Sequence, residues 1–112
     1  MQLNLSTVKE VLLPLNDRKK QEAVSTVKKS ISQCENFLGT MGPEKNEVWN
    51  DIIGLALKGL SIAMEVAGNI CDALLFEGDV IDVDVKTIEP LMLSQLVVAI
   101  TSQLKWVVEY EL

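Results

Sequence analysis

The sequence predicts an all-α fold: a small bundle of three long helices preceded by a short N-terminal helix, in a single domain over residues 1–112. Two observations support this prediction. Apolar residues recur at spacings of three and four over most of the chain, which is the period of an α-helix. Glycines, prolines and capping residues separate these periodic segments at positions typical of helix ends. With 48% hydrophobic residues, the chain can bury one core.

The first periodic segment, residues 3–13, predicts a short helix. Thr7 is followed three residues later by Glu10, which fits a capping box. The next proline ends or bends the run. Leu3 and Leu5 alternate with polar residues, so a brief extended arm is the alternative at the start of this segment.

The second segment predicts a one-faced amphipathic helix from Asp17 to Leu38. Asn16 is suited to the N-cap, and the Asp17 carboxylate in the first turn interacts favourably with the positive end of the helix dipole. Gly39 is a typical stop signal at the other end. This is the clearest amphipathic helix in the sequence.

The third predicted helix, Pro43–Phe76, is apolar around most of its circumference, so most of its surface must be covered. Only a thin polar line interrupts it, formed by Asp51, Gly54, Lys58, Ser61, Glu65, Asn69 and Asp72. A straight helix of this length would reach about 50 Å. A compact domain of this size has a diameter of roughly 34 Å. We therefore expect a break at Gly54, Gly59 or Gly68, or an extension of the helix into a second subunit.

Small side chains four residues apart mark where another helix can approach this one closely. Two of the long helices are apolar over more surface than a single small partner helix can cover, so we expect a homodimer. The predicted interface residues are Gly59, Ala63, Ala67, Cys71, Trp49 and Trp106.

The last part of the chain predicts a short extended stretch and then a long helix. Residues 79–86 show strand-like alternation. Thr87 is suited to the N-cap of the final helix, with Glu89 and Pro90 in its first turn. The tail, residues 105–112, also alternates and could form a strand, although no turn signal separates it from the helix before it.

Charge is unevenly distributed. Residues 1–45 carry seven Lys/Arg and five Asp/Glu, a balance of +2, whereas residues 46–112 carry three and eleven, a balance of −8. An acidic balance argues against nucleic-acid binding, which needs a basic face. Residues 52–76 are long enough to cross a membrane, but three charged side chains within them each cost about 2.5–3.5 kcal/mol near the bilayer centre. We therefore expect no membrane span.

Both cysteines, Cys34 and Cys71, lie at apolar helix positions. We interpret them as small buried residues of a protein in a reducing compartment. Because no basic and apolar leader is visible at the N-terminus, we expect a cytoplasmic location. A disulfide between the two cysteines is the alternative.

The sequence lacks the usual catalytic groups. It has no histidine, which removes the commonest general base and the usual zinc ligands. It has no glycine-rich phosphate-binding loop, and two isolated cysteines do not form a metal knuckle. Asp79, Asp82 and Asp84 could offer oxygen ligands to Ca²⁺ or Mg²⁺, but they lack the EF-hand spacing. We interpret them as a solvated acidic loop.

A second set of carboxylates lies on the third predicted helix. The candidate metal ligands are Glu44, Glu47, Asp51, Glu65 and Asp72. Around the last two, the segment EVAGNICDALL resembles the first motif of the MazG-like family, which places glutamates around an Ala-Gly pair. The resemblance implies an all-α nucleotide pyrophosphatase that holds Mg²⁺ over nucleotide phosphates. The chain departs from that motif at Val66 and Asn69, where the family has glutamates.

The final helix also departs from the family pattern, because Glu89 is its only carboxylate before residue 104. The competing interpretation places Glu65 and Asp72 on the solvent-facing line of a buried helix. Their seven-residue spacing returns them to nearly the same face. This interpretation explains both residues without a ligand.

These observations favour a non-enzymatic helical protein–protein interaction module without a cofactor. Adaptors, immunity-type proteins and inhibitors, including those that phages direct against host defences, have this character. The alternative is a degenerate Mg²⁺-dependent protein of the MazG-like type. A third class, a small-molecule-binding bundle, predicts an apolar pocket lined by Trp49, Met64 or Trp106.

Overall fold

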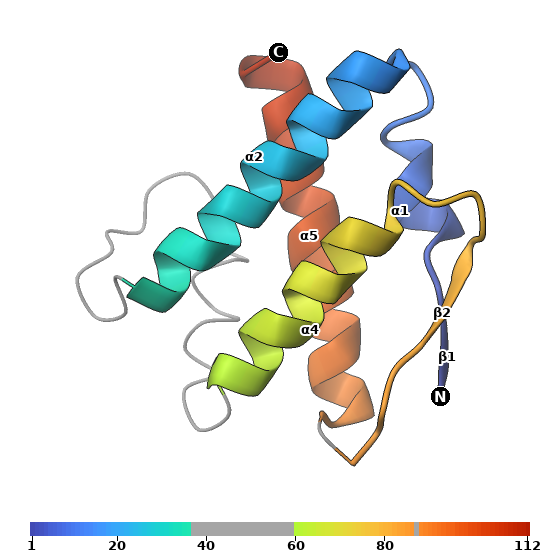
Figure 1. Ribbon diagram of the computed structural model, residues 1–112, viewed down its shortest axis with the longest axis vertical. Helices are drawn as coiled ribbons and strands as arrows, with labels where there is room; N and C mark the ends of the chain where they lie inside the picture. Colours follow the sequence, from blue (N-terminus) through green and yellow to red (C-terminus); the bar gives the residue numbers. More distant parts are fainter. Residues whose placement is uncertain (37–59, 87) are drawn as a thin grey trace.

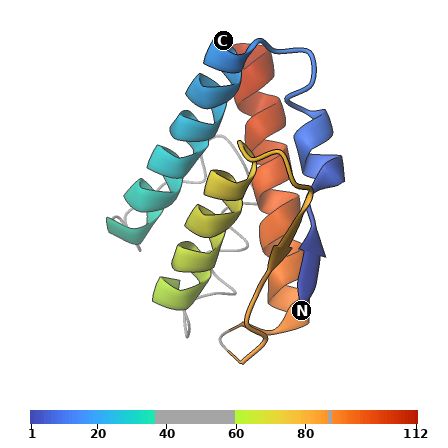
Figure 2. The same cartoon turned by 45° about the vertical axis from the view of Figure 1, so that its right-hand side comes forward.

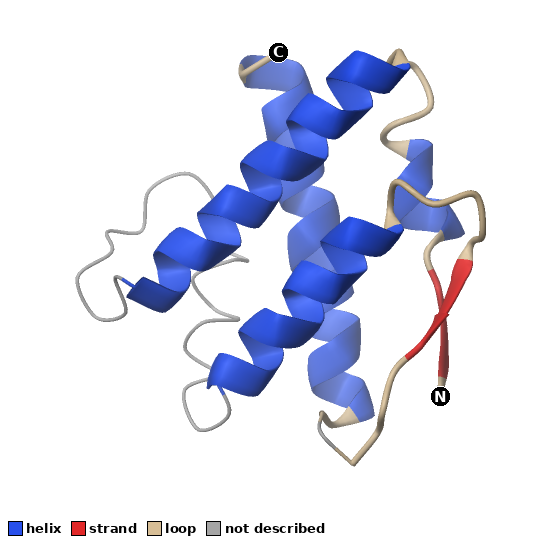
Figure 3. Ribbon diagram, in the orientation of Figure 1, coloured by secondary structure: helices blue, strands red, loops and turns tan. Residues whose placement is uncertain are grey.

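The computed structural model describes residues 1–36, 60–86 and 88–112. Its elements are β1 (Gln2–Asn4), α1 (Ser6–Glu10), α2 (Asp17–Asn36), α4 (Leu60–Ala73), β2 (Val80–Asp82) and α5 (Pro90–Tyr110). The described part is mostly helical with little strand, which confirms the all-α prediction (Figure 3). The predicted start of the third helix at Pro43 and its predicted breaks at Gly54 and Gly59 lie outside the described residues.

The helices pack around one core. α2 and α4 run side by side in opposite directions, and α5 crosses behind them and contacts both (Figure 1). α1 packs against α5. The two strands lie beside α5, on the side of α4 that faces away from α2 (Figure 2). The largest fully buried side chains come from several of these elements: Leu5, Val8, Val27, Ile70, Cys71, Leu93, Leu96, Ile100 and Leu104.

α4 has the two faces that the sequence predicts. Glu65, Asn69 and Asp72 are exposed and form the described part of the polar line. Apart from the exposed Ile62, the other described side chains of the helix are buried: Ala63, Met64, Val66, Ala67, Ile70, Cys71 and Ala73. The helix passes through Gly68 without a break, so Gly68 is not the predicted break point.

The predicted N-terminal cap is confirmed for α2 but not for α1. At α2 the prediction is confirmed, because the Asn16 Oδ1 atom accepts a hydrogen bond of 2.9 Å from the backbone N–H of Lys19. At α1 the capping box is wrong, since the helix begins at Ser6 and its N-cap residue, Leu5, makes no side-chain cap bond. The backbone N–H of Ser6 instead donates to the Asn4 Oδ1 atom at 2.8 Å.

The final helix begins later than predicted. Its N-cap is Glu89, in an extended conformation (φ −70°, ψ 144°), and Pro90 occupies the first turn. A proline disfavours the helical conformation in the residue before it, so Glu89, and not Thr87 as predicted, is the N-cap. The helix continues to Tyr110, which makes the alternative strand at residues 105–112 wrong.

The extended arm and the strand-like stretch come together as a two-stranded antiparallel sheet. Its register is Gln2↔Asp82, Leu3↔Ile81 and Asn4↔Val80. Met1 and Val83 exchange both backbone hydrogen bonds, at 3.0 and 2.8 Å. Hydrogen-bonded pairs alternate with unbonded pairs along an antiparallel ladder. The peptide groups of Val80 and Asp82 therefore point away from β1, towards the open edge of β2.

By length and composition, one helix in the described part of the chain, α5, could cross a membrane. The buried helix of a compact core meets the same criterion. α5 packs on α2 and α4 through seven buried residues: Leu93, Leu96, Ala99, Ile100, Gln103, Leu104 and Val107.

Candidate functional site

The strip of small residues lies inside the core of one chain. Ala63, Ala67 and Cys71 have no exposed surface, and their helix packs against α2 and α5 of the same chain. Another chain could reach them only if this core opened. Gly59 and Trp49, the other predicted interface residues of this region, lie outside the described residues.

Trp106, the remaining predicted interface residue, is half-buried on α5 and packs against the edge of the core. Its ring centroid lies 5.3 Å from that of Tyr110, one turn further on, with the planes tilted by 41°. Met64 is buried in the core, and Trp49, the third residue of the predicted small-molecule pocket, lies outside the described residues.

Cys71 is a free thiol, so the alternative of a Cys34–Cys71 disulfide is wrong. Burial raises the pKa of the Cys71 thiol to about 12, and the neighbouring Asp72 carboxylate adds to this rise. Lys28 acts in the opposite direction but does not offset it. A thiol with so high a pKa is protonated at neutral pH and is not nucleophilic.

The described carboxylates of the predicted metal set do not converge. The Asp72 Oδ1 atom lies 2.6 Å from the ammonium group of Lys28 on α2, whereas Glu65 lies about two helical turns earlier on the same line of α4, beside β2. Glu44, Glu47 and Asp51 lie outside the described residues. Within residues 1–36, 60–86 and 88–112, no group of three His, Cys, Asp or Glu side chains is placed to hold a metal ion.

A surface hollow of about 540 Å³ lies where the C-terminal end of α4 meets α1 and the start of α2. Three large apolar side chains border it and are exposed: Leu13 by 68%, Leu75 by 45% and Phe76 by 67%. We call these three residues the hydrophobic cap. Charged side chains of both signs line the same hollow, namely Lys9, Asp17, Lys20, Glu77 and Asp79.

The position of the cap follows from how α4 ends. The sequence predicts a helix up to Phe76, but α4 ends at Ala73. The chain then tightens into turns in which Leu75 and Phe76 donate to carbonyls three residues earlier, at 3.4 and 3.1 Å. This turn carries Leu75 and Phe76 away from the core and out to the surface.

Lys9 of α1 holds this turn in place. Its ammonium group donates hydrogen bonds to the backbone carbonyls of Phe76, at 2.7 Å, and of Gly78. It also lies 3.5 Å from the Asp79 carboxylate, and only 14% of its side chain is exposed. Lys9 thus satisfies two backbone carbonyls of the segment that follows α4.

Replacing Lys9 with methionine should lower the free energy of unfolding by about 1.5–3 kcal/mol, because hydrogen bonds to a charged group contribute about that much. Urea unfolding followed by circular dichroism measures the change. Lys20→Met is the matched control, since Lys20 lines the same hollow but forms no ion pair or side-chain hydrogen bond with other described residues. Equal losses in the two variants would contradict the role of Lys9.

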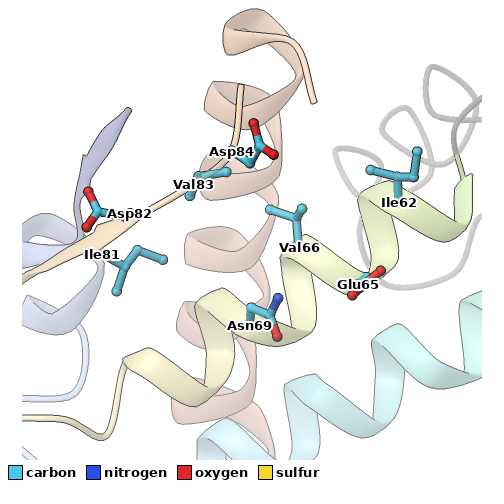
Figure 4. Close-up of a pocket in the computed structure, with 8 residues that line it drawn as sticks. All are labelled: Ile62, Glu65, Val66, Asn69, Ile81, Asp82, Val83 and Asp84. Atoms are coloured by element: carbon cyan, nitrogen blue, oxygen red, sulfur yellow. The ribbon is translucent and has the colours of Figure 1, made fainter. Parts of the chain in front are cut away.

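A second, smaller hollow of about 220 Å³ lies between α4 and β2. We call it the acidic groove. Its eight lining residues are Ile62, Glu65, Val66, Asn69, Ile81, Asp82, Val83 and Asp84, three of them acidic and none basic. Figure 4 shows Val66 of α4 and Val83 of the β2 segment pointing towards each other at its floor. The Asp82 carboxylate projects from the opposite face of the strand.

Comparison with protein families, with characterised proteins and with solved structures finds no match to this chain. The resemblance of residues 65–75 to the MazG-like motif is therefore not supported by any of these comparisons. The geometry of the two hollows is the basis for a functional proposal.

Proposed function

We propose that this protein is a non-enzymatic helical interaction module that forms a homodimer through the hydrophobic cap. The observation that supports the proposal is the exposure of Leu13, Leu75 and Phe76 around one hollow. Adjoining exposed apolar residues with a charged rim are characteristic of protein interfaces. Phe76 is the expected anchor, since large aromatic side chains contribute most to such interfaces.

The mixed charges around the cap favour a second copy of the chain as its occupant. In a two-fold symmetric contact each surface meets itself, so it must be complementary to itself. Asp17 and Lys20 at the start of α2 and Glu77 after α4 give the rim charges of both signs, which offer such complementarity. A free, buried Cys71 is consistent with a reducing compartment, so we include a cytoplasmic location in this proposal.

Light scattering after size-exclusion chromatography should give about twice the chain mass of 12.4 kDa at micromolar concentration. Phe76→Asp should shift the protein to the monomer mass, because a carboxylate buried in an apolar contact is strongly unfavourable. Leu91→Asp is the control, since Leu91 is equally exposed, at 71%, but lies on α5 away from the cap.

A wild-type protein that elutes as a monomer would refute the homodimer. A dimer that only Leu91→Asp disrupts would instead assign the interface to α5. Circular dichroism of each variant confirms that the fold is kept.

A Mg²⁺-dependent nucleotide hydrolase makes a different prediction. Mg²⁺ together with a nucleotide would raise the melting temperature, and Glu65→Ala would remove the rise. The Asp72–Lys28 ion pair and the separate position of Glu65 give no support to this alternative.

A further inference from the structure

The open edge of β2 borders the acidic groove. β1 covers the other edge of the strand, and β1 contributes no residue to the groove, which is lined by α4 and residues 81–84 alone. Figure 2 shows β2 between β1 and α4. The peptide groups that point away from β1 therefore belong to the side of the strand that faces the groove.

These peptide groups are available for pairing. On this side of the strand, the N–H groups of Val80 and Asp82 donate no hydrogen bond to any described residue, and their C=O groups accept none. An unpaired strand edge is a template for another strand. The pairing with β1 extends from Asp79 to Val83, so about 15 Å of extended edge is presented.

The two faces of this edge differ in chemistry. Ile81 and Val83 lie towards the core, next to Val66 of α4, and form an apolar floor. Asp82 is exposed on the opposite face, and Glu65 and Asp84 line the rim. A strand added here would place alternate side chains on these two faces. It would need apolar residues over the floor and basic residues beside the carboxylates.

We propose that the acidic groove binds an extended segment of a partner protein, with alternating apolar and basic residues, as a third strand beside β2. This addition of a strand to an open sheet edge combines main-chain hydrogen bonds for affinity with side-chain contacts for specificity. The proposal rests on the proposed interaction function but uses a different surface. The acidic groove lacks the mixed charge that favours self-association at the hydrophobic cap.

A synthetic eight-residue peptide that alternates valine and lysine, labelled with a fluorophore, tests the proposal by fluorescence anisotropy. It should bind saturably to the full-length protein, and added salt should weaken binding because charge attraction contributes. The same peptide with glutamate in place of lysine should not bind. No saturable binding of the lysine peptide at low salt would overturn the proposal.

Two methylated peptides test for strand addition as opposed to charge attraction alone. In one, the backbone nitrogens of the lysines carry methyl groups, and in the other those of the valines do. Only one of these alternate sets of N–H groups faces the β2 edge. That peptide should bind about tenfold more weakly, since it loses two or more hydrogen bonds, whereas the other should bind as the parent does. Equal affinity, or equal loss, in both methylated peptides would overturn the proposal.

Two variants at one position provide the matched test on the protein. Asp82→Asn should weaken binding about two- to fivefold by removing one exposed charge. Asp82→Pro removes the same charge and also the N–H group at the open edge, and should weaken binding about tenfold further. Equal binding by the two variants would contradict strand addition, and the Asn variant keeps the test valid if the Pro variant unfolds. Both variants should keep the light-scattering mass of the wild-type assembly. Loss of peptide binding is therefore distinguishable from loss of the homodimer.

Discussion

Replacing Ile70 with alanine should lower the free energy of unfolding by about 2–5 kcal/mol. The Ile70 side chain on α4 is fully buried, in the core that α4 forms with α2 and α5. Truncating a buried isoleucine removes apolar contacts and leaves a cavity that the surrounding core fills only in part. Marginally stable domains have only about 5–15 kcal/mol in total, so this single change should remove a large share of the stability.

Ile62→Ala is the matched control, because it makes the same chemical change on the same helix at a side chain that is 42% exposed. We expect it to cost less than about 1 kcal/mol. Urea unfolding measured at two protein concentrations gives both values. If Ile62→Ala costs as much as Ile70→Ala, the outward face of α4 is buried in an assembly and the assignment of the homodimer contact to the hydrophobic cap is wrong.

The faces of α4 could be predicted because they depend on spacing within one helix. Glu65, Asn69 and Asp72 recur at four and three residues, so any helical conformation places them on one line. The N-cap at Asn16 could be predicted for a similar reason, since its side chain bonds a peptide group only three residues away.

The start of α1 could not be predicted in this way. The backbone N–H of Leu5 donates to the carbonyl of Asp79 at 2.7 Å, a contact between distant parts of the chain. Pairing with β2 therefore sets where the N-terminal strand ends and where the helix begins. A local capping pattern such as Thr7 and Glu10 carries no information about that pairing.

Neither candidate surface could be predicted from the sequence, for the same reason. The hydrophobic cap combines Leu13 with Leu75 and Phe76, which meet only because α1 packs beside the end of α4. The one available signal was the position of Leu13 before a proline and of Phe76 close to a glycine, where helices end. The acidic groove needs β2 beside α4, which no periodicity in either segment specifies.

Stability should fall as the pH rises above 9, and Cys71 should account for much of the fall. The ordinary pKa of a cysteine thiol is 9.0, and in the folded protein burial raises that of Cys71 to about 12. Between these values the unfolded chain has lost the thiol proton, whereas the folded chain still holds it. The folded state then binds more protons than the unfolded state, so stability decreases with increasing pH, by up to about 1.4 kcal/mol per pH unit.

Urea unfolding at half-unit steps from pH 7.5 to 10.5, under a reducing agent, measures this slope. Cys71→Ala should flatten the curve by about 2 kcal/mol at pH 10.5 relative to pH 7.5, because alanine has no proton to lose. The slopes are compared, not the absolute stabilities, since the variant also loses some packing. If Cys71→Ala and the wild-type protein lose stability in parallel, the thiol is accessible enough to ionise in the folded state, and the closed core around α4 is wrong at that position.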